Sequence, residues 1–231
     1  MDTLNNLQRW LLYTPLGRHV LRSERNFYRN TVDNLFGYYS LQIGLPQINF
    51  LLGNQIPNHY VLGSDINCDL RFLPIASNSI DLIICPHTLE FTHNYHHLLQ
   101  ECYRILIPEG KLIITSFNKS SLLYWFGHKE KLLTKANFVN LNTLKQQLNT
   151  LNFRIDGGNF FNYLPPLNNV RHLSYLSWLN KVGNRWFPTM ANNYALVASK
   201  EVVTHTLVGK VKEVQNPKLQ VKLGTNKICK Q

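Results

Sequence analysis

The chain has 231 residues, of which 44% are hydrophobic and 12% aromatic. This composition excludes a disordered protein, and the length fits one large α/β domain with extensions. The net charge is +11, no apolar run is long enough for a membrane span, and the first ten residues do not form a secretory signal. The four cysteines show no paired spacing. We therefore expect a cytoplasmic protein with reduced cysteines.

Residues 4–36 have the spacing of two amphipathic helices, the second running from about Pro15 or Gly17 to Phe36 and ended by Gly37. We predict that residues 1–37 form a helical extension packed on the main domain and partly over its pocket. Residues 200–231 carry seven lysines against two glutamates. The tail, residues 201–231, is either a solvated, poorly ordered extension or an arm that contacts RNA, acidic lipid or an acidic partner.

The predicted core domain, residues 38–200, opens with a strand at Tyr38–Ile43, followed by Gly44. Pro46 is typical of a first helical turn, so a helix is expected from there to about Leu52. A strand, a glycine and a helix start together indicate an anion or nucleotide site, although a full dinucleotide motif has three glycines. A second strand is predicted at 59–64.

Two aspartates follow the second predicted strand. Asp65 lies about twenty residues beyond the first turn, where a carboxylate can accept hydrogen bonds from a ribose. An ordinary turn aspartate is the equal alternative. Asp69 either bonds an adenine amine or caps a loop.

Residues 73–118 contain two short apolar runs, at 81–85 and 111–116, on either side of a helical segment. The spacing of Leu98, Leu99, Cys102 and Ile105 puts them on one helix face. Strand, helix and strand within this length predict a parallel crossover buried on both sides. Ligands bind outside the carboxyl ends of such strands, so a pocket is expected beside residues 86–90 and 117–120.

The rest of the core is predicted to be a short surface helix or lid within 122–133, a helix at 141–151, and strands at 153–161 and 193–200. The two late strands should form an antiparallel hairpin at one sheet edge. Between them, Trp178 and Trp186 are expected to supply a hydrophobic wall. The predicted fold is α/β, a Rossmann-like and mostly parallel sheet with helices on both faces.

The stretch 73–118 resembles the class I S-adenosylmethionine-dependent methyltransferases, in particular the type 11 group. The resemblance rests on five segments in the family's order and spacing. They are Leu73-Pro74, Ile80-Asp81 with the strand after it, His87-Thr88-Leu89-Glu90, Leu98-Leu99-Gln100-Glu101, and Arg104 to Pro108 with the strand from Gly110. A short, uncharacterised bacterial subgroup is similar over roughly residues 7–200, through Trp10, Thr14–Gly17 and Tyr163–Pro166.

The resemblance implies S-adenosylmethionine as cofactor and a set of residues that contact it. The first-strand loop of the family, Asp-x-Gly-x-Gly-x-Gly, is Gln42-Ile43-Gly44-Leu45-Pro46 here. Only seven residues separate Asp65 from Leu73, too few for the usual helix and third strand, so the sheet should be truncated at that edge. The cofactor-binding residues carried over are Gln42, Gly44, Asp65, Asp69 and His87.

Methyl transfer from a sulfonium requires little covalent help, since the cofactor supplies the electrophile and the protein aligns the acceptor. His87 is the catalytic candidate, as a base or in positioning substrate, and a structural hydrogen-bonding histidine is the favoured alternative. Asn118 and Tyr163 are substrate-pocket candidates by position. His93 and His97 are four residues apart, but no Cys or acid completes a tetrahedral set, so no metal is expected.

We predict a methyltransferase acting on an unidentified acceptor, most simply a small molecule. Two alternatives stay open. One is an RNA or protein methyltransferase, supported by the basic charge but by no RNA-reading motif. The other is a non-enzymatic descendant that kept the sheet and lost cofactor binding, which the reduced glycine loop would permit.

Overall fold

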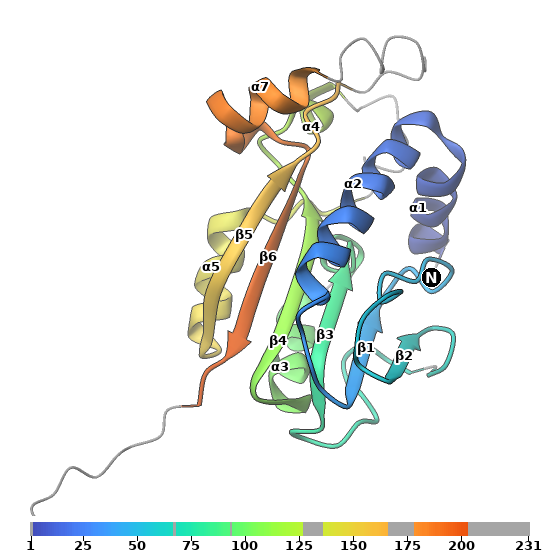
Figure 1. Ribbon diagram of the computed structural model, residues 1–231, viewed down its shortest axis with the longest axis vertical. Coiled ribbons are helices and arrows are strands. Elements are labelled where there is room, and N and C mark those ends of the chain that lie inside the picture. The colour runs from blue at the N-terminus through green and yellow to red at the C-terminus, as the bar shows by residue number, and fades with distance from the viewer. Residues whose placement is uncertain (1, 67, 93, 127–135, 166–177, 203–231) are drawn as a thin grey trace, which may run out of the picture.

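The computed structural model describes residues 2–66, 68–92, 94–126, 136–165 and 178–202, and shows one six-stranded sheet (Figure 1). The strand order is β2-β1-β3-β4-β6-β5, in which β2, β1, β3 and β4 are parallel and β6 is antiparallel to both neighbours. The strands are β1 (Tyr39–Ile43), β2 (Asn58–Leu62), β3 (Ile80–Pro86), β4 (Leu106–Phe117), β5 (Phe153–Phe161) and β6 (Asn193–Lys200).

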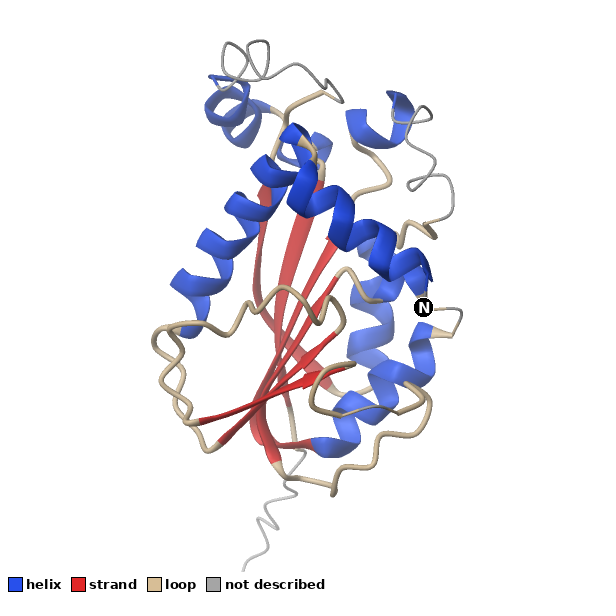
Figure 2. Cartoon of the chain, turned by 90° about the vertical axis from the view of Figure 1, so that its right-hand side faces the viewer, coloured by secondary structure: helices blue, strands red, loops and turns tan. Residues whose placement is uncertain are grey.

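Helices cover both faces of this twisted sheet (Figure 2). One apolar cluster joins α1 and α2 to one face, and a second joins α3 and α5 to the other. The helices are α1 (Asp2–Tyr13), α2 (Pro15–Val32), α3 (Tyr95–Ile105), α4 (Leu122–Phe126), α5 (Leu141–Thr150) and α7 (Trp178–Trp186), with short 3-10 turns η1 (Leu89–Phe91) and η4 (Pro188–Met190). The predicted Rossmann-like fold is confirmed.

The central crossover of β3, α3 and β4 has the predicted parallel geometry. Successive side chains of a strand point to opposite faces, and β3 divides its apolar residues accordingly. Leu82 and Ile84 pack toward α1 and α2, while Ile83 and Cys85 pack toward α3. Apolar residues on both sides of β3 explain why this strand reads as a continuous apolar run.

The edges of the sheet also follow the prediction. The hairpin of β5 and β6 has the expected residues, and β6 inserts between β4 and β5. At the other edge the sheet ends at β2, and residues 68–79 contain no further strand. The chain is too short there for another helix and strand, so the predicted truncation is confirmed.

The N-terminal helices join at Thr14, whose side chain accepts a hydrogen bond from the Gly17 N–H at 3.0 Å. Pro15 occupies the first turn, where its missing N–H costs nothing. The second helix ends at Val32, before the predicted Phe36. Gly37 therefore lies beyond the end of the helix. A glycine is needed there because a Cβ would lie 2.5 Å from the side chain of Asp81.

Two expectations for the insertion before β6 differ from the structure. Trp178 and Trp186 are 54% and 69% exposed, so they form no inner hydrophobic wall. They lie at the two ends of the short helix α7, and Gly183 of this helix lies against the ring of Tyr163. The predicted lid residues 127–133 and the insertion residues 166–177 lie outside the described residues, as does the tail from 203 onward.

Candidate functional site

A cavity of about 780 Å³ lies at the carboxyl ends of β1, β2 and β3. Its volume falls within the range of small-molecule sites, roughly 300–1,000 Å³. The α1 residues Leu4 and Asn5 contribute to its wall, so the N-terminal extension covers part of the pocket. The described residues that line it are Leu4, Asn5, Gly44, Pro46, Leu62, Gly63, Cys68, Asp69, Leu70, Arg71, Thr88, Phe91, Thr92 and Asn94.

The loop after β1 is organised by the buried side chain of Gln42. Its Nε2 donates to the carbonyl oxygens of Gly44, Leu45 and Ile48, at 3.0, 3.2 and 2.7 Å. Its Oε1 accepts from the Phe50 N–H at 3.0 Å. The side-chain amide of Gln42 therefore provides hydrogen-bond partners for backbone groups of this loop that helical hydrogen bonds would otherwise satisfy.

The helix predicted from Pro46 to Leu52 does not form, and this expectation was wrong. Leu45 has a φ of 48°, outside the helical region, and the segment that follows consists of turns. Because the carbonyl oxygens of Gly44, Leu45 and Ile48 accept hydrogen bonds from the Gln42 amide, they are not available for the backbone hydrogen bonds of a regular helix. The segment after β1 therefore provides no helix N-terminus to the cavity, and Gln42 itself is buried and is not among the described cavity-lining residues.

Replacing Gln42 with glutamate is expected to lower the free energy of unfolding by about 2–4 kcal/mol, although the family pattern has an acid at this position. A carboxylate cannot donate to the three carbonyl oxygens and would be buried among them. Urea denaturation measures the effect, and the exposed Gln47→Glu in the same loop is the control, expected to change stability by no more than about 0.5 kcal/mol. Equal effects of the two substitutions would contradict this role of Gln42.

Gly44 and Thr88 bring the first two loops of the site into contact. Gly44 has a φ of 93°, and a Cβ built on it would lie 2.5 Å from the Thr88 Oγ1. The Thr88 hydroxyl in turn donates to the carbonyl oxygen of Ile43. The close approach leaves no room for a side chain, which explains why position 44 is a glycine.

His87 lies beneath the cavity in a fully buried network of polar side chains. Its Nε2 is 2.6 Å from the Glu24 Oε1 of α2, and its Nδ1 is 3.0 Å from the Glu90 Oε1 of η1. The Asn193 amide of β6 donates to Glu24 at 2.9 Å. The Ser116 hydroxyl and the Phe117 N–H donate to Glu90 at 2.9 and 2.6 Å. The network thus ties the N-terminal helices to the ends of β3, β4 and β6.

The charge state of His87 follows from its two carboxylate neighbours. Burial by itself lowers the pKa of an imidazole, but attraction to Glu24 and Glu90 and hydrogen bonds to both outweigh burial and raise the pKa of His87 to about 10. Both ring nitrogens therefore donate at neutral pH. A histidine held protonated between two acids is a poor general base. The geometry favours the structural interpretation.

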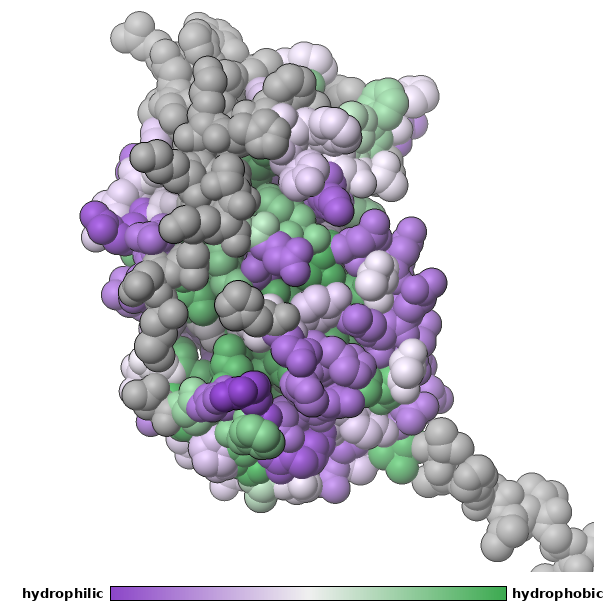
Figure 3. Space-filling view, turned by 180° about the vertical axis from the view of Figure 1, so that it is seen from behind, coloured by the Kyte–Doolittle hydropathy of each residue, from purple (hydrophilic) through white to green (hydrophobic). Residues whose placement is uncertain are grey.

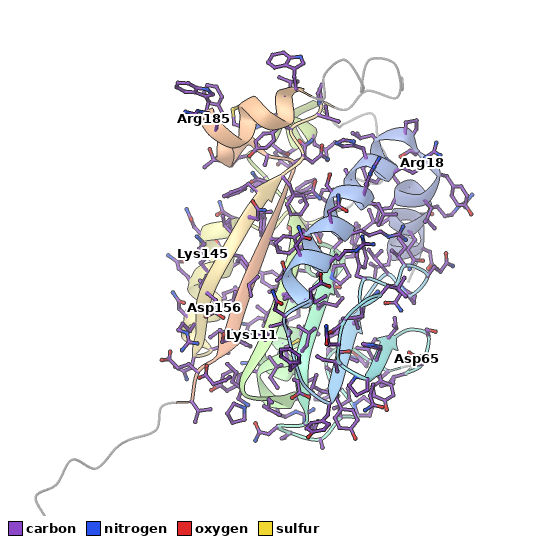
Figure 4. The ribbon with its side chains drawn as sticks, in the orientation of Figure 1. Arg18, Asp65, Lys111, Lys145, Asp156 and Arg185 are labelled. Carbon is purple, nitrogen blue, oxygen red and sulfur yellow. The ribbon has the colours of Figure 1, made fainter. Side chains whose placement is uncertain are left out.

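The two aspartates of the predicted cofactor set lie in different places. The Asp65 carboxylate accepts from the Val61 N–H at 2.7 Å, is exposed at the outer edge of the sheet (Figure 4) and does not belong to the described cavity lining. Asp69 lines the cavity and forms a two-pronged ion pair with Arg71, with contacts of 2.6 to 3.1 Å. The structure therefore brings Gly44 and Asp69 together and leaves Asp65 outside.

The two predicted substrate residues lie under the η4 and α7 region, outside the described cavity lining. The Asn118 amide donates to the carbonyl oxygens of Thr189 and Ala191 at 2.7 and 2.9 Å, and its Oδ1 accepts from the Ser120 N–H. Tyr163 is 6% exposed and packs beneath Gly183 of α7. Both side chains hold this end of the molecule together.

Sequence reasoning missed Glu24, although a signal for it exists. Val20, Glu24 and Tyr28 recur every fourth residue on the buried face of α2. An acid within such an apolar stripe requires a buried partner, because an unpaired buried charge is strongly unfavourable. The pattern gives no indication that the partner is His87, 63 positions away.

Comparison with known proteins supports the fold and the family resemblance. Residues 54–114 match the family model for a methyltransferase domain. A methyltransferase structure from Thermotoga maritima, described as a possible histamine N-methyltransferase, superposes with a TM-score of 0.61 at 16% identity, covering 87% of this chain and 97% of that one. Geranyl diphosphate C-methyltransferase from Streptomyces coelicolor, solved with S-adenosyl-L-homocysteine, has a TM-score of 0.55 at 12% identity, covering 80% of each.

The family match supports a methyltransferase domain, and the superposed structures show the fold of S-adenosylmethionine-dependent methyltransferases. The chain is also 27% identical to the uncharacterized protein YafS of Escherichia coli over 213 residues, which is 85% of this chain and 82% of that protein.

Proposed function

We propose that the protein transfers the methyl group of S-adenosylmethionine to a small-molecule acceptor bound in the cavity at the carboxyl ends of β1, β2 and β3. The observation that supports this is the size and position of that cavity, which opens beside the Gly44 turn and includes residues of α1 and η1. The cofactor supplies an electrophilic methyl group, and the protein's part is to bind and align.

Within this proposal, the cofactor side of the cavity is formed by Gly44, Gly63, Asp69 and Thr88. Gly44 and Gly63 both have a φ of 93°, which residues with a side chain rarely adopt, and they form tight turns at two neighbouring strand ends that line the cavity. Asp69 adds a carboxylate that can accept hydrogen bonds from ribose hydroxyls. These features fit the cofactor, although Gln42 is engaged with its own loop.

The acceptor side of the cavity is formed, on the same proposal, by α1 and the segment after Thr88. Leu4 and Phe91 supply apolar surface, and Asn5, Thr92 and Asn94 supply hydrogen-bonding groups. A mostly apolar wall with a few polar groups is typical of small-molecule sites. His87 acts indirectly, by fixing the turn that carries Thr88.

Calorimetric titration with S-adenosylmethionine tests the proposal. We expect saturable binding, weakened about tenfold or more by Asp69→Asn, because hydrogen bonds to a charged acceptor contribute roughly 1.5–3 kcal/mol. The control is Asp65→Asn, which keeps the contact with Val61 and should change the affinity less than about twofold. Failure of the folded wild-type protein to bind would contradict the proposed function. A larger effect of Asp65→Asn would move the ribose contact to that residue.

A further inference from the structure

Large apolar side chains, most of them aromatic, are exposed at one end of the molecule, where α4 and α7 lie beyond the sheet (Figure 1). Trp125 of α4 is 66% exposed, Trp178 and Trp186 of α7 are 54% and 69% exposed, and Phe187 and Met190 are 58% and 42% exposed. We call these five residues the aromatic end. Ordinary soluble surfaces scatter exposed apolar residues singly, so such a gathering indicates an interaction surface.

The aromatic end is free of acidic residues. No Asp or Glu occurs between 157 and 200, between 110 and 129, or between 3 and 23, the stretches that contain α7, α4, the junction of α1 and α2, and the loops around them. Arg185 projects from α7, and Arg18 lies at the same end of the molecule, near the junction of α1 and α2 (Figure 4). Within the described residues, α4, α7 and the junction of α1 and α2 therefore present basic and aromatic groups without an acidic side chain.

The arrangement on α7 is regular. Residues seven and eight apart occupy one broad side of a helix, so Trp178, Arg185 and Trp186 share a side. In the view from behind, strongly hydrophilic residues gather over the middle and lower part of the molecule, whereas pale residues predominate at the end that carries α7 (Figure 3). Indole rings beside guanidinium groups are the groups that favour the boundary between lipid headgroups and acyl chains.

We propose that the aromatic end docks on the surface of an anionic lipid bilayer. The indole rings of Trp178, Trp186 and Trp125 enter the headgroup region, and Arg185 and Arg18 lie against lipid phosphates. Binding at such a surface combines buried apolar area with attraction to negative lipid. The docking itself requires no methyl transfer. The parallel strands β3 and β4 point toward this same end of the molecule (Figure 1).

A single-stranded RNA is the competing ligand for aromatic and basic groups. RNA platforms stack bases on aromatics along a groove that follows the backbone. The two exposed tryptophans of α7 instead belong to a helix that stands out from the body (Figures 1 and 2), and neither lines the cavity beside Gly44 or the smaller one beside β5. A projecting helix fits a flat bilayer surface better than an extended strand of nucleotides.

Cosedimentation of the full chain with lipid vesicles tests the proposal. We expect binding to vesicles of phosphatidylcholine and phosphatidylglycerol in equal parts, and weak binding to phosphatidylcholine alone. The double variant Trp178→Ser/Trp186→Ser should lose about tenfold or more in vesicle affinity. The matched control is Phe36→Ser/Tyr38→Ser, which removes side chains that are 77% and 74% exposed in the connection between α2 and β1, and it should bind as the wild type does.

Charge reversal tests the electrostatic part separately. Arg185→Glu should weaken binding to the anionic vesicles by about tenfold or more, since each basic residue near the surface contributes roughly a fivefold factor. Lys145→Glu on α5, which lies away from the aromatic end (Figure 4), should change it by less than about twofold. Equal effects of the two reversals would indicate a general charge effect and overturn the proposal.

Tryptophan fluorescence separates this surface from the basic tail. Insertion of the indoles should shift the emission to shorter wavelength on anionic vesicles, and the double tryptophan variant should lose most of the shift. Binding without a shift, or unchanged binding of the double tryptophan variant, would assign the lipid contact to the tail and overturn the proposal. Failure of the wild type to bind vesicles, with tryptophan-dependent binding to a single-stranded RNA, would overturn it in favour of RNA.

Discussion

Replacing Glu24 with alanine is expected to lower the free energy of unfolding by about 3–5 kcal/mol, a large part of the stability of an ordinary domain. The substitution leaves His87 buried with one carboxylate partner in place of two and removes the acceptor of the Asn193 amide. It also removes the polar contact of α2 with β6, while the hydrogen bond between Tyr28 of α2 and Thr115 of β4 remains. Urea denaturation followed by circular dichroism measures the change.

The control for this prediction is Arg25→Ala, the next residue on the same helix. Arg25 is exposed, so its loss should change stability by no more than about 0.5 kcal/mol. Similar effects of the two alanine substitutions would show that the buried network contributes little. Glu24→Gln separates charge from shape, because glutamine keeps the size of the side chain and can still accept a hydrogen bond from His87.

The same network predicts a dependence of stability on pH. The pKa of His87 is raised in the folded protein from 6.5 to about 10. Its contribution to stability is therefore fully present below pH 6.5 and is lost as the pH rises toward about 10. In Glu24→Gln the attraction of Glu24 is absent, so the stability advantage of the wild type over this variant should shrink across that window. A constant advantage would contradict a protonated His87.

Replacing Gly44 with alanine is expected to reduce S-adenosylmethionine affinity by at least about tenfold and to lower the free energy of unfolding by about 2–4 kcal/mol. The φ of 93° disfavours any side chain, and the new methyl group would meet the Thr88 hydroxyl. Relief of that contact would separate the loops after β1 and β3, which line the cavity together. Calorimetry and urea denaturation measure the two effects.

Gly53 is a matched control for Gly44. Its φ is 88°, but no atom lies within 4 Å of the position of a Cβ there. Gly53→Ala should therefore show the backbone strain alone, roughly 1–2 kcal/mol, with cofactor affinity unchanged. Adding Thr88→Ala to Gly44→Ala should recover part of the loss, because it removes the atom that the new methyl group meets. Equal effects of Gly44→Ala and Gly53→Ala on stability and cofactor affinity would contradict a role for the close approach of Gly44 to Thr88.

The elements that local sequence pattern predicted correctly are those whose formation depends on neighbours along the chain. The apolar runs of β3 and β4, the helical spacing from Leu98 to Ile105, and the β5–β6 hairpin were placed within a few residues. Truncation of the sheet beyond β2 followed from the number of residues available. Each of these features follows from periodicity, turn chemistry or length.

The predictions that failed depended on side-chain contacts and helix orientation, which the spacing of apolar residues does not show. Pro46 is a good first residue of a helix, but the Gln42 amide engages the carbonyl oxygens of the loop and holds it in turns. Trp178 and Trp186 looked like interior residues because tryptophan is largely apolar, and the orientation of α7 leaves them exposed. Neither outcome is encoded in the spacing of nearby residues.

The crossover at 73–118 and the methyltransferase resemblance could thus be identified from sequence, because a buried parallel strand and its flanking turns impose a local pattern. The interior of the site could not. Only the tertiary structure joined Glu24, His87, Glu90 and Asn193 into one network and placed Asp69, but not Asp65, on the cavity wall. A buried charge can be stabilised by any partner that the fold brings within reach, so the sequence shows that a partner is needed without showing which residue it is.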